Sequence, residues 1–580
     1  MKSHEIWAFI PLFSVLVSVE FIYYLSLAVG YSRQTIIFSF LVLTAAYAFV
    51  VYKKGEPLQL PNFLRFRQIK KTSLLLFAVI FLIALAVLVK SVWSPSPYGI
   101  VLTGSNWQDT PFHYDVIESL NQGNFPPQTP NYSGTPLGYY YFVDFHTAII
   151  EKVYGYLPTV LPVLNAIFIL VFALAVYALA RPLGKQAAII ATVIGVFGWG
   201  LSYFGLFSAI FNGTFNVNTN YGYQFGQQFG LPSIFDNLLQ QRPLLVGLPA
   251  FALVLALLRD MDDDRRLLLA GVVTGLVYEF HSVAFFCCYV AFVVCLLLNV
   301  KKLRLGYLYF LVPTALALPF IFGGGQSFSL SLSTAFLAQF VQNNNPIIYY
   351  FLNLGIPFIL AVVSFAKVGN EHLKLTFLLL FLIPNFLLLT PWAWDMYKFF
   401  IFAWVPIAVL SGALLAKTRK TIIFTLVLLS IITSASVIIY NVGTNYTGAS
   451  WSEYQLGLWV RSNTPEKSVF LTYYSIQCPV TMIGGRLRVD SYVYWPYGHG
   501  IPLDQVYQRD HDIDAAYTGN ATQLLAVIEK YNVTYVYVGN DELSHYSGCT
   551  ERFNAISWLK PVYTNQNLEI YQVELNKTGN

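Results

Sequence analysis

Charged residues are scarce in this sequence: Asp, Glu, Lys and Arg together make up 11% of its 580 residues. Soluble domains carry about 25% charged residues, so the composition excludes an ordinary soluble protein. Cysteine is also rare, and five cysteines in a chain of this length exclude a small scaffold built on many disulfides. The net charge of +5 is small and spread along the chain, which gives no reason to expect a nucleic-acid partner.

Two familiar signals are missing as well. The segments that we predict to be cytoplasmic contain no glycine-rich loop followed by Lys, so the sequence does not favour an ATP-driven pump. The first apolar run is long and has no small-residue cleavage site after it. We therefore expect this run to remain as a helix rather than to be removed as a signal peptide.

Long apolar runs are what the sequence has in abundance, with 56% hydrophobic residues. A helix needs roughly 20 apolar residues to cross the hydrocarbon core of a bilayer. The sequence therefore predicts a polytopic α-helical membrane protein with about thirteen spans. The predicted spans lie near 6–29, 33–52, 72–92, 158–180, 186–206, 242–258, 267–281, 283–299, 306–323, 346–366, 373–390, 399–416 and 421–440.

The distribution of Lys and Arg predicts the orientation of these spans. With the N-terminus in the cytoplasm, the inner segments hold 20 Lys and Arg residues and the loops between spans on the outer side hold five. This asymmetry is typical of the positive-inside rule. All six Asn-x-Ser/Thr sequons fall in segments predicted to be outside, namely at Asn131, Asn212, Asn445, Asn520, Asn532 and Asn576. We expect a multi-pass protein of the cell membrane whose larger loops are extracytoplasmic.

Two domains follow from this topology. Residues 1–440 form the predicted transmembrane domain. It has two large outer loops, and the first of them spans 93–157. Residues 441–580 form a predicted extracytoplasmic α/β domain, because helix and strand patterns alternate in it. The patterns indicate helices over 450–461 and 523–531 and strands over 468–472 and 533–539. The sequence leaves open whether Cys478 and Cys549 of this domain form a disulfide.

The outer loop 93–157 carries the cluster most suited to chemistry. Asp109 and His113 are four residues apart and share a face if 110–120 is helical. A carboxylate at this level can serve as the general base for a hydroxyl acceptor, and Asp115 is a second acidic candidate. The alternative is a solvated loop in which Asp109 only caps a helix, since Asp-Thr-Pro is a typical helix start.

Further polar residues lie at the outer ends of predicted spans. Arg242 and Lys398 are cations at the depth where a lipid phosphate would bind. Glu279, His281 and Asp395 lie at the same level. The commoner role of such residues is to anchor a helix at the interface by extending toward water.

At this point the chain resembles the GT-C superfamily of membrane glycosyltransferases, which use sugars linked to polyprenyl phosphate. The resemblance is carried by short motifs: FH at 112–113, NFPP at 124–127, GTPLGYYY at 134–141 with Tyr140, EFH at 279–281, WDMYKFF at 394–400, WVRSNTPE at 459–466, GGR at 484–486, SYVYW at 491–495, GHG at 498–500 and YVYVG at 535–539. The last five motifs are similar to the soluble tail of such enzymes.

Two departures from this group are visible. Its members often have adjacent acidic residues in the first outer loop, whereas Asp109 stands alone with Asp115 six residues later. Oligosaccharyltransferases carry a WWDYG motif, and the matching segment 494–498 reads YWPYG, without the Asp. Transfer to peptide Asn is therefore the weaker interpretation.

The resemblance implies an inverting transferase that moves a sugar from a polyprenyl-phosphate donor to a hydroxyl of a glycan, lipid or protein acceptor. In this hypothesis Asp109 is the base, His113 or Asp115 positions the acceptor or the base, and Arg242 and Lys398 bind the phosphate. We expect Asp109 and at least one of Arg242 and Lys398 to line one cavity that opens sideways to lipid under the C-terminal domain. The sequence defines no metal site and leaves a divalent-cation requirement open. The alternatives are a flippase or transporter for lipid-linked glycans and an oligosaccharyltransferase-like enzyme.

Overall fold

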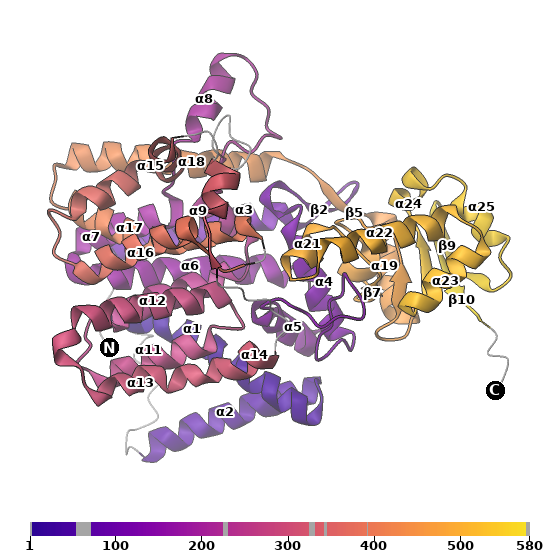
Figure 1. Ribbon diagram of the computed structural model, residues 1–580, viewed down its shortest axis with the longest axis horizontal. Helices are drawn as coiled ribbons and strands as arrows, with labels where there is room; N and C mark the ends of the chain where they lie inside the picture. Colours follow the sequence, from indigo (N-terminus) through magenta and orange to yellow (C-terminus); the bar gives the residue numbers. More distant parts are fainter. Residues whose placement is uncertain are drawn as a thin grey trace.

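The computed structural model describes residues 3–53, 71–223, 230–323, 331–341, 345–390 and 392–575. It consists of a helical body with the C-terminal part of the chain, in yellow, at one end (Figure 1). The basic segment 54–70, predicted to be cytoplasmic, and the sequon at Asn576 lie outside the described residues.

The helical body contains a helix at each of the thirteen predicted positions. These helices are α1 (Ser3–Val29), α2 (Arg33–Lys53), α3 (Lys71–Ser91), α6 (Val160–Ala180), α7 (Lys185–Phe197), α10 (Leu244–Leu257), α11 (Asp264–Leu276), α12 (Ser282–Leu298), α13 (Leu308–Leu311) with α14 (Leu318–Gly323), α15 (Pro346–Ser364), α16 (Glu371–Phe386), α17 (Lys398–Leu415) and α18 (Lys420–Gly443). In the part of the chain that the structure describes, eight helical segments are long and apolar enough to cross a membrane. The count of thirteen spans stays a prediction.

The predicted fifth span, 186–206, is wrong at its outer end. Helix α7 stops at Phe197, and a separate helix α8 (Tyr203–Phe211) follows. Two backbone segments approach each other closely just after this break: a Cβ on Gly200 would lie 2.3 Å from the carbonyl oxygen of Leu352. Helix α15 is itself kinked close to this contact, at Gly355, which has a φ of 65°. Helix α8 therefore projects from the body, at the top of Figure 1.

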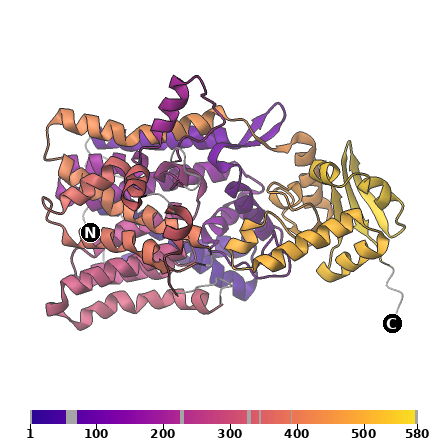
Figure 2. The ribbon, with the colours of Figure 1, turned by 45° about the horizontal axis from the view of Figure 1, so that its top comes forward.

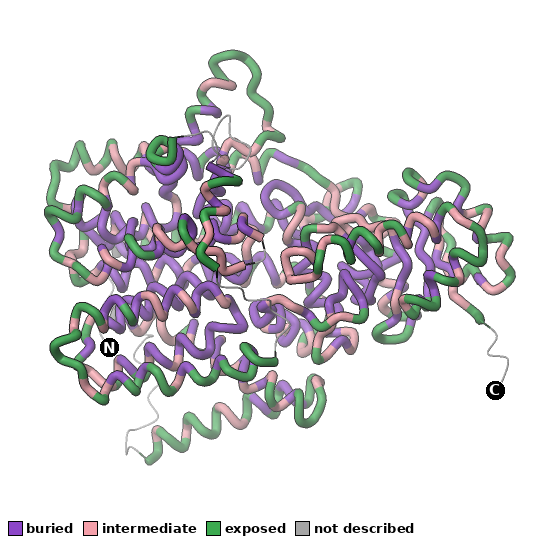
Figure 3. Tube along the Cα trace, viewed as in Figure 1, coloured by how far each residue is buried: buried purple, intermediate pink, exposed green. Residues whose placement is uncertain are grey.

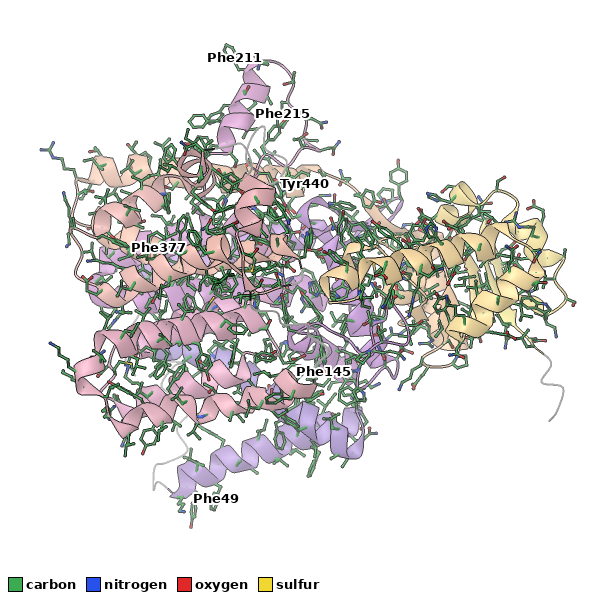
Figure 4. All side chains as sticks on the ribbon, viewed as in Figure 1. Phe49, Phe145, Phe211, Phe215, Phe377 and Tyr440 are labelled. Atoms are coloured by element: carbon green, nitrogen blue, oxygen red, sulfur yellow. The ribbon has the colours of Figure 1, made fainter. Side chains whose placement is uncertain are left out.

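Burial separates the central helices from the peripheral ones. Helix α17 is buried along its whole length, whereas most of α2 is accessible. The buried residues gather in the middle of the body in Figure 3. Phe49 of α2 and Phe211 of α8 are 63% and 91% exposed and point away from the body (Figure 4). Exposed apolar side chains at this density indicate faces that contact lipid.

The outer loop 93–157 is structured. It contains β1 (Val92–Ser96), β2 (Gly99–Leu102), α4 (Asp109–Asn121) and α5 (Phe142–Tyr154). Strand β2 pairs on its other edge with β5 (Thr447–Ser450), in an antiparallel sheet of order β1-β2-β5. Gly99 permits this pairing, because a Cβ there would lie 2.1 Å from the carbonyl oxygen of Ala449. The sheet therefore ties the outer loop to the segment that follows α18.

The second outer region, 207–241, contains a short buried helix, α9 (Ile234–Gln240). A smaller two-stranded sheet pairs β3 (Ser331–Leu332) with β4 (Leu387–Leu388). Both features lie close to the outer ends of the helices that frame the site described below.

After α18, which continues to Gly443, the chain forms a five-stranded mixed sheet of order β7-β6-β8-β10-β9. The elements are α19 (Trp451–Asn463), β6 (Val469–Leu471), α20 (Pro479–Met482), β7 (Leu487–Arg488), α21 (Tyr494–Gly498), α22 (Leu503–Thr518), α23 (Ala521–Tyr531), β8 (Tyr535–Val538), α24 (Asn540–His545), α25 (Cys549–Asn554), β9 (Leu559–Asn565) and β10 (Leu568–Val573). All four helices and strands predicted for this region are present. Cys478 and Cys549 are both buried free thiols.

Strand β8 shows why the sheet is covered on both faces. Its residues alternate, so that Tyr535 and Tyr537 pack in one apolar cluster and Val536 and Val538 in another. The first cluster includes residues of α19, and the second includes residues of α22 and α23. Successive strand residues point to opposite faces of a sheet, which explains the wholly buried strand.

Direct contacts fix this α/β region against the outer loop. Arg461 donates to the Glu118 carboxylate at 2.5 Å, and Glu118 is fully buried. The backbone of Arg488 exchanges hydrogen bonds with Pro130 and Ser133 at 2.9 and 3.0 Å. The α/β region lies directly against the loop helices in Figure 2. The boundary at residue 440 and the extracytoplasmic location of this region stay predictions.

Candidate active site

A cavity of about 720 Å³ lies between the helical body and the α/β region. Four separate parts of the chain form most of its wall: the start of α4, the turn before α5, the segment leading into α17, and the segment 492–500. The polar and charged lining residues are Gln108, Asp109, His113, Tyr139, Tyr140, Tyr223, Gln240, Gln241, Tyr278, Ser282, Gln339, Thr390, Asp395, Tyr397, Lys398, Tyr492, Tyr494 and His499. Sequence-distant groups thus converge on one space.

The first turns of α4 bring Asp109 and His113 to this wall. The helix spans Asp109–Asn121, so the condition under which Asp109 and His113 share a face is met, and both side chains line the cavity one turn apart. Gln241 donates a hydrogen bond to the Asp109 carboxylate. Burial raises the pKa of Asp109, while the nearby His113 and Lys398 act in the opposite direction. A carboxyl group with a raised pKa is better suited to accept a proton than an ordinary surface Asp.

Lys398 faces Asp109 from the start of α17. Its Nζ lies 3.0 Å from Oδ1 of Asp395 and 3.2 Å from the hydroxyl of Tyr140. Tyr140 is held in place because its ring stacks on Tyr139 and on His281, with centroid separations of 4.3 and 4.9 Å. The ammonium group of Lys398 is therefore held in a fixed position in the cavity wall by Asp395 and Tyr140.

Arg242 is placed differently from the prediction. Its side chain is fully buried behind the cavity wall, and NH1 donates to Oδ1 of Asp144 at 2.6 Å. Its other donors are also occupied: Nε by Asn165, and NH2 by Thr147 and by the Val143 carbonyl. The sequence predicted that Arg242 binds the donor phosphate. Every nitrogen of its guanidinium instead donates to a protein group, so Arg242 is not available to a phosphate.

Replacing Arg242 by Met is expected to destabilise the protein by about 3–5 kcal/mol, because it leaves the buried Asp144 carboxylate without its charge partner. The measurement is thermal unfolding of the purified protein in detergent. Arg181, which is less buried and lies outside the cavity lining, supplies the matched Arg→Met control. A similar loss of stability in both variants would contradict the assignment.

Three other predicted site residues also lie behind the wall. Asp115 is fully buried in α4 and accepts a hydrogen bond from Asn131 at 2.7 Å. Burial raises the pKa of Asp115 to about 7, opposed by nearby Arg488. Glu279 is buried, and its carbonyl accepts from the backbone N–H of Phe142. His281 supports Tyr140 and caps α12. These residues shape the cavity from outside.

Asp144, Gln241 and His499 were not identified as site residues from the sequence. Asp144 contacts His113 across 31 residues, a separation with no recognisable spacing. His499 belongs to a GHG motif, but no metal ligand or nucleophile at a typical spacing indicated that it is a site residue. It lines the cavity, and burial lowers its pKa to about 3, so its imidazole is neutral. Within the described residues, no group of three or more His, Cys, Asp or Glu could hold a metal ion.

Comparisons with known proteins give little. No family model matches the chain, and no curated protein matches it. Among solved structures, the chain is similar to the archaeal oligosaccharyltransferase AglB from Archaeoglobus fulgidus, solved in complex with an inhibitory peptide and a dolichol-phosphate. The likeness covers 81% of this chain and 70% of that chain, with 14% identity and a TM-score of 0.39. A TM-score of this size does not establish a shared fold.

The cavity nevertheless has a definite chemical character. It combines two carboxyl groups, a cation and two imidazoles with several aromatic rings and amide side chains. Such a set can accept a proton on one side and stabilise developing negative charge on the other.

Proposed function

We propose that this protein is a membrane glycosyltransferase of the GT-C type that transfers a sugar from a lipid-phosphate donor to a hydroxyl acceptor. The observation that carries the proposal is the placement of Asp109 and Lys398 in one cavity, between apolar helices and the α/β region. A lipid-linked donor needs a site at this level, because its tail stays in the bilayer while its sugar enters a polar space. The proposed location of the cavity is the extracytoplasmic face.

The rest of the lining suits a carbohydrate. Trp392, from the segment before α17, and Tyr494, from α21, stack on each other with a centroid separation of 5.4 Å, and both line the cavity. Trp394 and Trp495 add further rings, and Gln108 and Gln241 are among the amides. Aromatic faces match the apolar faces of a sugar ring, and amides match its hydroxyl groups.

The proposed reaction is a single displacement. The acceptor oxygen forms a bond to the anomeric carbon while the bond from that carbon to the phosphate oxygen breaks, so the configuration inverts. The electron pair leaves with the lipid phosphate, whose negative charge Lys398 stabilises. The proton of the acceptor hydroxyl passes to Asp109. Phosphate is a good leaving group, so the reaction needs no separate acid.

The deciding experiment is transfer of radiolabelled sugar from a polyprenyl-phosphate donor by the purified protein in proteoliposomes. We expect a labelled product that requires both the donor and a hydroxyl acceptor. Flipping of the donor without transfer would overturn the proposal in favour of a transporter. Transfer only to peptide Asn, lost in a chelator, would overturn it in favour of an oligosaccharyltransferase.

Replacing both Trp392 and Tyr494 by Ala is expected to raise KM for the acceptor by about 2- to 12-fold, with kcat much less affected. Losing aromatic contacts worth about 0.5–1.5 kcal/mol corresponds to this change. Initial rates over a range of acceptor concentrations measure it. Tyr98, which is 80% exposed in the turn between β1 and β2, is the control, and its Ala variant should keep the wild-type KM. An unchanged KM in the double variant would contradict an acceptor site here.

A further inference from the structure

Behind the cavity wall, three charged or ionisable side chains form a continuous chain. Arg242 donates to Oδ1 of Asp144 at 2.6 Å, and Oδ2 of Asp144 lies 2.9 Å from Nδ1 of His113. Arg242 and Asp144 are fully buried, while His113 reaches the cavity. The three residues come from the segment before α10, from α5 and from α4.

The chemistry of this chain fixes the proton on His113. A carboxylate paired with a guanidinium can only accept hydrogen bonds, so the hydrogen in the contact with Asp144 belongs to Nδ1. In the neutral imidazole the other nitrogen, Nε2, then carries a lone pair. Because Nδ1 is occupied by the buried Asp144, Nε2 is the nitrogen left for the cavity.

We propose that Asp144, anchored by Arg242, is a positioning residue that holds His113 with a bare Nε2 beside Asp109, where it receives the proton removed from the acceptor. This inference rests on the proposed function for its catalytic part. The proton moves from the acceptor hydroxyl to Asp109 and from Asp109 to Nε2, which leaves Asp109 ionised again. The resulting imidazolium is offset by the Asp144 carboxylate, and the proton passes to water when the product leaves.

The same geometry predicts what an amide at position 144 would do. The Asn oxygen would face NH1 of Arg242, since a guanidinium only donates. The amide NH2 would then face Nδ1 of His113, which can no longer carry a hydrogen. The proton would move to Nε2, and His113 could not accept one from Asp109.

The test compares wild type with Asp144→Asn by two readouts. In protein labelled with 15N-histidine, the wild-type His113 signal is expected to show a protonated Nδ1 and a bare Nε2, and a His113→Gln variant identifies that signal. In Asp144→Asn the two nitrogens should exchange these states. We expect kcat to fall about 10- to 100-fold, while KM for donor and acceptor stays within about twofold.

Glu118→Gln is the matched control, because it also weakens a buried carboxylate–Arg pair but lies away from the cavity. It should keep the wild-type nitrogen pattern and kcat. A bare Nδ1 in wild type would overturn the proposal even if Asp144→Asn failed to fold. An equal loss of kcat in Glu118→Gln and Asp144→Asn would overturn it as well. Absence of any transfer by wild type would instead remove the proposed function and leave the nitrogen assignment standing.

Discussion

Replacing Asp109 by Asn is expected to lower kcat by about 10²- to 10⁴-fold, the usual contribution of a general base. Asn has the same shape as Asp and can still accept the hydrogen bond from Gln241, so the cavity should keep its form. It cannot take up a proton, so the acceptor hydroxyl would remain a poor nucleophile. The measurement is the initial rate of sugar transfer at saturating donor and acceptor, together with the unfolding temperature.

Asp115→Asn is the control for this prediction. Asp115 lies on the same helix but behind the wall, and burial already raises its pKa to about 7. The neutral amide should therefore be a close substitute there, with kcat near that of wild type. A large loss of kcat in Asp115→Asn combined with near-normal turnover in Asp109→Asn would exchange the roles of the two residues.

Replacing Lys398 by Met is expected to reduce kcat/KM for the donor by about 10²- to 10³-fold, the loss typical when a group that stabilises transition-state charge is removed. Met keeps the length of the side chain but not its charge. The change also leaves Asp395 unpaired in the cavity, where its carboxylate would repel the donor phosphate. Donor titrations in the transfer assay measure the effect.

Lys90→Met provides the comparison, because Lys90 donates to Asn445 and does not line the cavity. It should leave kcat/KM unchanged. If Lys398→Met bound and used the donor as well as wild type, the phosphate would have to be bound elsewhere, and Lys398 would have only a structural role.

The sequence predicted what depends on local spacing. Asp109 and His113 share a face because they are four residues apart, and the alternation in β8 follows from the period of a strand. The membrane level of Lys398 stays a prediction. Its contact with Tyr140, 258 residues away, depends on how distant helices pack, which no local pattern contains.

Arg242 and Gly200 show where sequence reasoning stops. A cation at the end of a span can extend toward water, bind a ligand or pair with a buried acid, and the choice depends on Asp144, 98 residues earlier. The segment after α7 is placed in the same way, since Gly200 lets it approach the backbone of Leu352. Both features result from contacts between segments far apart in the chain.

The attachment of the α/β region through β5 and the backbone of Arg488 has a consequence for competition between substrates. Water is the most abundant hydroxyl compound near any extracytoplasmic site, and an activated sugar held next to a base would be hydrolysed if water reached it freely. In the proposed reaction, residues 492–500, which line one side of the cavity, and the bound acceptor would together displace water from the reacting carbon. The ratio of transfer to hydrolysis would then depend on how firmly this region is attached.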